Sequence, residues 1–343
     1  WEDITTPGDG NWANGMAAVY TGNIPVPPAK PTGLVATPGN NQVTLKWSQN
    51  SESDITKYYI YGGTSASPTT RVDSTTSSSD TTKAITGLTN GTLYYYRIAA
   101  VDSARIESWK TSDVTSLPHA TDGSYSLSFN GTDDYVDFGD DDDFDFGTGD
   151  FTIEAWINPT IASQNGRIVA RGDTGNPGSY QLNINTNGRL RISFYENELN
   201  SSNNVINANT WQHLVLTRNG TTVKGYVNAE EIISFSNSSN LTSSQALVIG
   251  YEPGSSSYFN GLIDEVAIWN DALTASEITA LYNSGDPLAA SSNSGNYTSS
   301  ANLKGYWRFG ENTSTTAYDI SGNGNHGTLT NGPSYSTPGA DAL

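Results

Sequence analysis

Short runs of strand-forming residues, separated by turn residues, most restrict what this chain can fold into. In Gln42–Trp47, apolar Val43, Leu45 and Trp47 alternate with polar residues, the pattern of a half-buried strand. Similar runs recur along the chain between Gly, Asn, Asp and Ser residues. The predicted strands are residues 42–47, 57–61, 83–88, 92–101, 125–129, 151–157, 167–170, 180–185, 189–195, 211–218, 222–227, 246–250 and 261–269. We therefore predict an all-β chain.

One short helix is predicted after the last of these strands. Thr274 and Glu277 have the spacing of a capping box, with Thr274 as N-cap. Apolar residues at positions 278, 281 and 282 form its buried stripe, and Gly285 is the predicted stop. Because the helix is short, packing rather than propensity must stabilise it.

The length of 343 residues suits two domains. The Pro-rich segment 25–31 predicts a stiff linker. We predict one β-sandwich over residues 32–118 and a second over residues 119–336, and we interpret residues 1–24 as an N-terminal extension or the tail of a preceding domain. The chain starts with Trp rather than Met and has no signal peptide, so we expect a mature fragment or an excised piece.

Charge and composition exclude several classes of partner. The 35 acidic and 16 basic residues give a formal net charge of −19, which disfavours nucleic acids and anionic lipid surfaces. No run of about 18 apolar residues is present, so we predict no membrane insertion. The chain has no cysteine, which excludes disulfides and thiolate metal sites but does not assign a compartment.

The first series of strands resembles a fibronectin type III domain. Trp47 on an early strand and the motif LTNGTLY, residues 88–94, carry the resemblance. It implies that Trp47 packs in the core and that Tyr94 forms the tyrosine corner of that family. A domain of this kind would act as a spacer.

The second series resembles the laminin-G/concanavalin-A-like superfamily. The phrases SLSFNGTDDYVDFGD, FTIEAWINP, NTWQHLVLTRNGTTVKGYVN and FNGLIDEVAIWNDALTASEITALYNSG carry the resemblance in that order. Ala229 departs from it, because the family often has Gly at this turn. The resemblance implies a jelly roll, as in bacterial multidomain secreted proteins, and hence a secreted or cell-surface location.

The tail, residues 301–336, resembles the segment that commonly opens such a jelly roll. Two interpretations stay open: the tail folds back to close the jelly roll, or it begins a second, truncated copy. We favour the first, because an unfolded tail would expose Tyr306, Trp307 and Phe309 as an apolar patch.

The resemblance also implies a structural calcium ion. Asp264 lies within a hydrophobic strand, where a carboxylate is costly unless it is paired or bound to a cation. Members of the superfamily often hold Ca²⁺ with such an Asp and with groups after the first strand, which here are Asn130, Gly131, Asp133 and Asp134. Oxygen ligands of this type suit Ca²⁺. The alternative is that Asp264 caps backbone N–H groups.

Two other acidic segments are weaker candidates for a cation. The turn of residues 319–323 is an alternative site, or else an Asx-type turn. Side chains of the acidic run 140–143 point to alternate sides of an extended chain, so few could share one ion, and we interpret the run as a solvated loop.

Binding of a glycan asks for an exposed aromatic face beside polar groups. Tyr180, Tyr195, Tyr251 and Tyr258 lie near predicted loop ends and are the candidate ligand-binding residues. The tryptophans lie in strands that match the superfamily, and we expect them in the core.

The sequence predicts no catalytic residues. The three histidines are scattered, no G-x-S-x-G motif occurs, and no strand carries the closely alternating carboxylates of glycosidases. We predict a non-catalytic extracellular module that binds a polysaccharide, a cell-surface glycan or a protein. The alternatives are a stalk segment of an adhesin without a sugar site and an accessory part of a polysaccharide-degrading enzyme.

Overall fold

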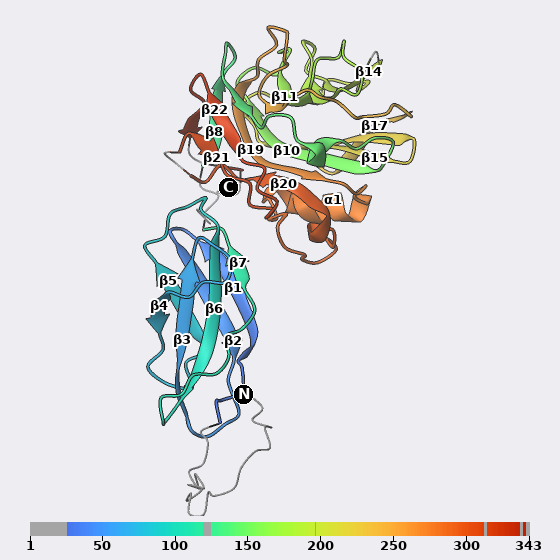
Figure 1. The fold of residues 1–343 in the computed structure, drawn as a ribbon. Coiled ribbons are helices and arrows are strands. Elements are labelled where there is room, and N and C mark those ends of the chain that lie inside the picture. Colours follow the sequence, from blue (N-terminus) through green and yellow to red (C-terminus); the bar gives the residue numbers. More distant parts are fainter. Residues whose placement is uncertain (1–25, 119–124, 196, 312–313, 337–338, 341–343) are drawn as a thin grey trace, which may run out of the picture.

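The computed structural model describes residues 26–118, 125–195, 197–311, 314–336 and 339–340. Two β-sandwiches follow one another along the chain (Figure 1). The predicted fold class, all-β with two sandwiches and one short α-helix, is confirmed. Within the described ranges, no helix has both the length and the apolar character needed to cross a bilayer.

The first sandwich packs a three-stranded sheet against a four-stranded sheet. Their strand orders are β1-β2-β5 and β4-β3-β6-β7. The strands are β1 (Thr32–Gly39), β2 (Gln42–Ser48), β3 (Ile55–Gly63), β4 (Arg71–Ser74), β5 (Thr82–Thr86), β6 (Tyr94–Asp102) and β7 (Val114–Ser116).

Trp47 and Tyr94 have the roles that the sequence predicts. Trp47 is 3% exposed and meets the ring of Tyr58 edge-on, with centroids 5.3 Å apart. The hydroxyl of Tyr94 accepts a hydrogen bond from the backbone N–H of Thr89 at 3.2 Å. This bond ties the turn before β6 to its own strand, as a tyrosine corner does.

The second sandwich consists of two eight-stranded sheets. The β10 sheet has the order β17-β16-β15-β10-β19-β8-β23, with β20 also paired to β19, and the β12 sheet has the order β14-β13-β12-β11-β18-β9-β22-β21. Its first twelve strands are β8 (Ser126–Asn130), β9 (Tyr135–Asp137), β10 (Phe151–Pro159), β11 (Arg167–Arg171), β12 (Tyr180–Ile184), β13 (Leu190–Phe194), β14 (Asn197–Asn200), β15 (Gln212–Asn219), β16 (Thr222–Val227), β17 (Glu230–Ser236), β18 (Leu247–Ile249) and β19 (Asn260–Trp269).

Strand alternation builds the core between these sheets. Ile153 and Leu216 of the β10 sheet and Leu182 and Ile192 of the β12 sheet are fully buried in one apolar cluster. Because successive residues of a strand face opposite sides, the residues between them point away from this core. The outward face of the β12 sheet is polar, and it is considered below.

The C-terminal tail supplies strands to both sheets. Strand β20 pairs with β19 and β23 pairs with β8, while β22 pairs with β9 and with β21. The four tail strands are β20 (Leu303–Trp307), β21 (Thr316–Ala317), β22 (Gly327–Thr330) and β23 (Ser334–Ser336). Trp307 and Phe309 are fully buried in the core between the sheets.

Helix α1 (Ala275–Tyr282) lies on the outer side of the β10 sheet, close to β20 (Figure 1). Its predicted capping box is present: Thr274 Oγ1 accepts from the N–H of Glu277 at 3.3 Å, and Glu277 Oε2 accepts from the N–H of Thr274 at 3.0 Å. The predicted stop at Gly285 is wrong. The left-handed residue that ends the helix is Asn283, at φ 42°, a conformation that asparagine tolerates.

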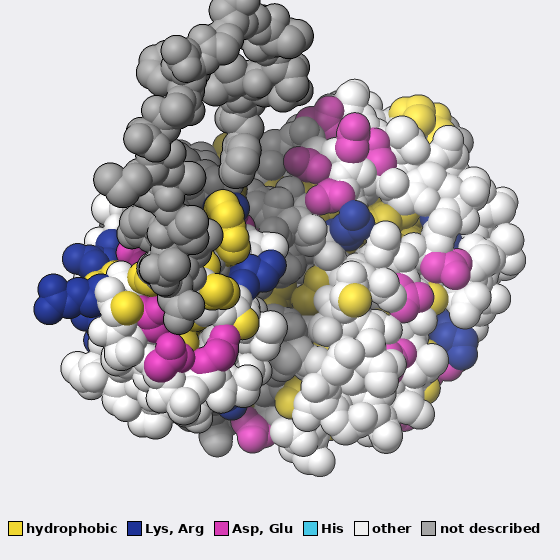
Figure 2. All heavy atoms as spheres, turned by 60° about the horizontal axis from the view of Figure 1, so that its bottom comes forward, with side chains coloured by type: hydrophobic (Ala, Val, Ile, Leu, Met, Phe, Trp, Pro, Cys, Tyr) yellow, Lys and Arg dark blue, Asp and Glu magenta, His cyan; other side chains and the backbone are white. Residues whose placement is uncertain are grey.

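Uncharged polar side chains and backbone predominate on the molecular face shown in Figure 2, and charged side chains are scattered among them. Among the described residues, the exposed large apolar side chains are Val26, Val35, Val72, Leu93, Trp109 and Ile161. Among these, Ile161 alone belongs to the second sandwich. The described surface of the second sandwich therefore offers mainly polar contacts.

Candidate functional site

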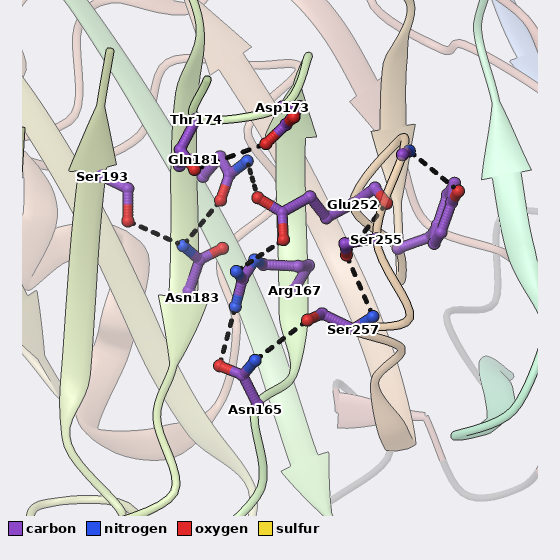
Figure 3. Close-up of polar contacts among 12 residues, drawn as sticks. Asn165, Arg167, Asp173, Thr174, Gln181, Asn183, Ser193, Glu252, Ser255 and Ser257 are labelled. Atoms are coloured by element: carbon purple, nitrogen blue, oxygen red, sulfur yellow. Dashed lines mark hydrogen bonds and ion pairs between the residues drawn. The ribbon is translucent and has the colours of Figure 1, made fainter. Parts of the chain in front are cut away.

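The outward face of the β12 sheet carries a connected set of polar side chains. In β12 the apolar residues face the core, so Gln181 and Asn183 face outward. Arg167 from β11 and Ser193 from β13 lie beside them, and loop residues 252–257 approach from the other side (Figure 3). All four strand residues are buried. Planar amide and guanidinium groups thus form the base of this face.

Glu252 is the centre of the set. Its Oε2 accepts from Arg167 Nη2 at 2.6 Å and its Oε1 from Gln181 Nε2 at 2.8 Å. Burial opposes ionisation, but the bonds from Gln181 and Arg167 hold the pKa of Glu252 below its ordinary value. Glu252 is 3% exposed and Arg167 is 6% exposed, so this is a buried, hydrogen-bonded ion pair that fixes the loop onto the sheet.

The amides continue the set towards β13. Asn183 Nδ2 donates to Gln181 Oε1 at 3.0 Å and to Ser193 Oγ at 3.2 Å. Three buried atoms, Asn183 Oδ1, Arg167 Nε and Arg191 Nε, have no hydrogen-bond partner among the described residues. A buried polar atom without a partner costs about 1–3 kcal/mol. These three atoms are buried within the base, so a ligand on this face would meet the rim residues and not the three atoms themselves.

Asn165 forms the exposed rim above this base. Its Oδ1 accepts from Arg167 Nη1 at 2.9 Å and also from Arg191 Nη2, and its Nδ2 donates to Ser257 Oγ at 2.9 Å. Asn165 is exposed, whereas Arg191 and Ser257 are partly buried. The buried residues thus hold the rim residues in a defined arrangement that a ligand can reach.

Tyr180, predicted to bind a ligand, is instead a core residue. It is fully buried, its ring packs against Phe146 and Phe151, and its hydroxyl donates to the carbonyl of Phe144 at 3.0 Å. The prediction is wrong for this residue, because Tyr180 lies on the side of β12 that faces the core. Tyr195 is partly buried and directly follows β13.

Tyr251 and Tyr258 come together with a third tyrosine that the sequence did not single out. Their rings stack with centroids 4.5 Å apart, and Tyr135 of β9 lies 5.1 Å from Tyr251. All three are partly buried. This stack lies at the base of the loop that carries Glu252, so an aromatic surface borders the polar face.

The structure separates the residues predicted to share a calcium ion. Asn130 pairs with Asn260 across β8 and β19, and Asp264 lies four residues further along β19. At the rise of a strand this is about 13 Å, too far for one ion. The register therefore contradicts the single site predicted from Asp264 and the turn after β8.

The turn after β8 is closed by its own hydrogen bonds. Asn130 Oδ1 accepts from the N–H of Thr132 at 2.7 Å and of Asp133 at 3.1 Å, and the N–H of Asn130 donates to Asp134 Oδ2 at 2.9 Å. Gly131 has φ 74° and packs against Asn260. Burial raises the pKa of Asp134. These contacts describe a local turn.

Asp264 accepts hydrogen bonds from the backbone. It is fully buried, with Oδ1 accepting from the N–H of Glu265 at 2.8 Å and Oδ2 from the N–H of Ala340 at 2.7 Å. Glu265 has φ 47° at an irregularity in the pairing of β10 and β19. Backbone N–H donors thus stabilise this buried carboxylate, which is the alternative that the sequence left open.

The acidic segments considered as weaker cation sites also have protein partners. Asp319 is fully buried and accepts hydrogen bonds from backbone N–H groups of its own turn. In the run 140–143, Asp140 accepts from Arg171 and Asp143 from Lys304. The solvated-loop interpretation of that run is therefore incomplete. No group of three or more His, Cys, Asp or Glu side chains suited to a metal occurs among the described residues.

Glu154 and His213 form an acid–base pair within the described part of the chain. Glu154 Oε2 lies 3.0 Å from His213 Nε2, and burial raises the pKa of Glu154. Both residues are at most 2% exposed, on the side of the β10 sheet that α1 covers. A substrate cannot reach this pair in the described structure.

Comparison with known families agrees with this architecture. Residues 29–115 match the fibronectin type III domain, and residues 130–279 match the concanavalin A-like lectin/glucanases superfamily. The chain therefore contains a fibronectin type III domain followed by a concanavalin A-like domain. No curated protein is similar enough in sequence to be matched with it.

Several solved structures are distantly similar. A Bacteroides ovatus protein provisionally described as carbohydrate-binding is 15% identical, with a TM-score of 0.49 over 90% of this chain and 96% of that chain. The Ruminococcus gnavus IT-sialidase CBM40 bound to α2,6 sialyllactose is 13% identical, with a TM-score of 0.37 over 46% and 98%. Domain 4 of AbnA, a GH43 extracellular arabinanase from Geobacillus stearothermophilus, in complex with arabinotriose, is 17% identical, with a TM-score of 0.32 over 68% and 91%. These likenesses are too distant to identify a ligand.

The polar face of the concanavalin A-like domain was missed by the sequence reasoning. A signal was present, because YQLNI (residues 180–184) and RLRISF (residues 189–194) place planar or hydroxyl polar residues at alternate positions of successive strands. The position of Glu252 over those residues had no comparable signal, since it depends on how a loop from β18 folds back.

Proposed function

We propose that this chain is a non-catalytic, extracellular glycan-binding module and that the outward face of the β12 sheet contacts the sugar. The fibronectin type III domain serves as its spacer. The observation that carries the proposal is the rim of Asn165, Arg191 and Ser257 held above a buried polar base. Amide, guanidinium and hydroxyl groups donate to and accept from sugar hydroxyls.

The neighbouring tyrosines support the proposal. Sugar rings present C–H groups on one face, and aromatic side chains with a polar end suit that contact. Tyr195 follows β13 at one side of the face, and the stack of Tyr251, Tyr258 and Tyr135 borders the other. A few convergent polar groups beside aromatic surface are typical of small-molecule sites.

A glycan array with the complete chain tests the proposal, followed by calorimetry on the best ligand. We expect Asn165→Ala and Ser257→Ala each to weaken binding by about three- to tenfold, the effect of losing one or two hydrogen bonds. Ser234→Ala is the matched control, because Ser234 is exposed on β17 of the other sheet. If no glycan binds, or if Ser234→Ala weakens binding as much as Ser257→Ala, the proposal is wrong and a stalk segment without a sugar site becomes the better interpretation.

A further inference from the structure

The basic side chains of the second domain are unevenly distributed. Eight of the 16 Lys and Arg residues follow residue 124. Five of these contact carboxylates or backbone carbonyls elsewhere: Arg171, Arg218, Lys224, Lys304 and Arg308. Of the other three, Arg167 lies on β11, Arg191 lies on β13, and Arg189 directly precedes β13. All three lie next to the polar face. Three guanidinium groups therefore gather on one face of a chain whose net charge is −19.

Two of these guanidinium groups converge on one neutral atom. Asn165 Oδ1 accepts from both Arg167 Nη1 and Arg191 Nη2. The Nε atoms of both arginines are buried and have no partner among the described residues. Burial, followed by repulsion from Arg191, lowers the pKa of Arg167. Asn165 Oδ1 is therefore a neutral acceptor shared by two positive charges, each of which also has one carboxylate partner, Glu252 for Arg167 and Glu198 for Arg191.

The nearby carboxylates do not balance these charges equally. Both carboxylate oxygens of Glu252 already accept hydrogen bonds, one from Arg167 and one from Gln181. Arg191 has Glu198 as its carboxylate partner, at 3.4 Å on a side chain that is 46% exposed. The Arg191 side chain is 11% exposed, but a pair at this distance with a half-exposed carboxylate contributes little. Arg189 donates its Nε–H to an amide, Asn204 Oδ1, at 3.3 Å. Of these arginines, Arg191 is the one that contacts the exposed rim residue Asn165 and has a weak carboxylate partner, so a better acceptor at the rim could engage it.

We infer that the glycan bound by this face carries a carboxylate, which binds Arg191 in place of Glu198. This inference rests on the proposed function. Arg191 Nη2 is bonded to Asn165 and its Nε is buried, so the carboxylate would bind Nη1, the atom that contacts Glu198. A bond from Arg to a carboxylate is stronger than one to a neutral hydroxyl. Both uronic acids and sialic acids carry this group, and the test separates them.

Calorimetry with two matched pairs tests the inference on the complete chain. The first pair is tetragalacturonate and its methyl ester, and the second is sialyllactose and lactose. We expect the acid of at least one pair to bind about tenfold more tightly than its neutral partner, because one charge-assisted bond is added. Arg191→Gln should abolish that difference. Glu198→Gln should strengthen binding of the acid about two- to fivefold, because it removes a competing carboxylate, and should leave the neutral partner unchanged.

The outcomes distinguish the inference from the function on which it rests. Lys224→Gln is the control for the loss of a positive charge, because Lys224 lies on β16 of the other sheet in an exposed pair with Glu231. If acid and neutral sugars bind equally, or if Lys224→Gln lowers the preference for acid as much as Arg191→Gln, the inference is wrong while glycan binding stands. If the acids do not bind and neutral glycans on the array do, the inference is also wrong. If nothing binds, both fail.

Discussion

Replacing Asp319 by alanine should destabilise the concanavalin A-like domain more than a typical surface substitution. Asp319 is fully buried in the tail between β21 and β22. Its Oδ1 accepts from the N–H groups of Tyr306 at 3.0 Å and Ser321 at 2.8 Å. Its Oδ2 accepts from the N–H groups of Gly324 at 3.0 Å and Asn325 at 2.9 Å, and from Ser321 Oγ at 2.9 Å. One carboxylate therefore holds a whole turn against β20.

The magnitude follows from what alanine leaves behind. The N–H of Tyr306 belongs to a fully buried residue, whereas Gly324 is exposed and water can replace its partner. A buried donor without a partner costs about 1–3 kcal/mol, and bonds to a charged group are at the upper end. We expect a loss of about 4 kcal/mol, or about 8–16 °C in the melting temperature of a domain of this size.

Differential scanning calorimetry measures this effect, with the fibronectin type III transition as internal reference. Asp286→Ala is the control, because its side chain is exposed. Asp319→Asn should give an intermediate loss, since one oxygen acceptor remains. A fall of less than about 3 °C for Asp319→Ala would mean that less than about 1 kcal/mol depends on these bonds, and it would refute the reasoning.

Two further predictions test the second domain. Ala229→Gly should raise the melting temperature of this domain by about 2–4 °C, because Ala229 has φ 65° in the β16–β17 turn and a left-handed Ala costs about 1 kcal/mol. Gly220→Ala should lower it similarly, because Gly220 has φ 57° and an added Cβ would meet only open space, so the backbone strain alone acts. Equal melting of the wild type and these two variants would contradict the argument. Burial raises the pKa of Glu311 from 4.5 to about 7, so the folded state binds this proton more tightly than the unfolded state. The resulting stabilisation, up to about 3 kcal/mol, is complete below pH 4.5 and is lost as the pH rises through 7. Melting from pH 4 to 8 should therefore show a decline that Glu311→Gln lacks, and parallel curves would refute it.

Strand periodicity was sufficient to predict most of the fold, and the misses have a physical cause. The run 151–157 became β10 (Phe151–Pro159) and the run 261–269 became β19 (Asn260–Trp269), because both are long and apolar. The predicted runs did not include β1, β4, β7, β9, β14 or β17 (Glu230–Ser236), and β17 shows why. It contains adjacent Ile232 and Ile233, and the register shift in its pairing with β16 breaks the alternation. The pairing of the tail strand β23 with β8 joins residues about two hundred positions apart, which no local pattern encodes.

The candidate site was harder to predict, because it depends on register and burial. Tyr180 and Gln181 are neighbours in one strand, and only the direction of the core shows that the tyrosine is buried and the amide faces outward. The predicted calcium site required Asn130 and Asp264 to be opposite one another, but the register places Asn130 opposite Asn260. Tyr251 and Tyr258 were correctly placed at a loop, and their partner Tyr135 became visible only with the pairing of β9 and β18.

The loop between Tyr251 and Tyr258 explains how small polar residues can present a defined rim. The two tyrosines bridge its base and stack on one side. Glu252 faces the opposite side, because successive residues of an extended chain alternate, and there it meets Arg167. A displacement of the loop would disrupt the aromatic stack and leave Arg167 buried without its carboxylate, a large cost. Contacts at the base of the loop therefore order Ser257, and Ser257 together with Arg167 and Arg191 orders the exposed Asn165 side chain that a ligand can reach.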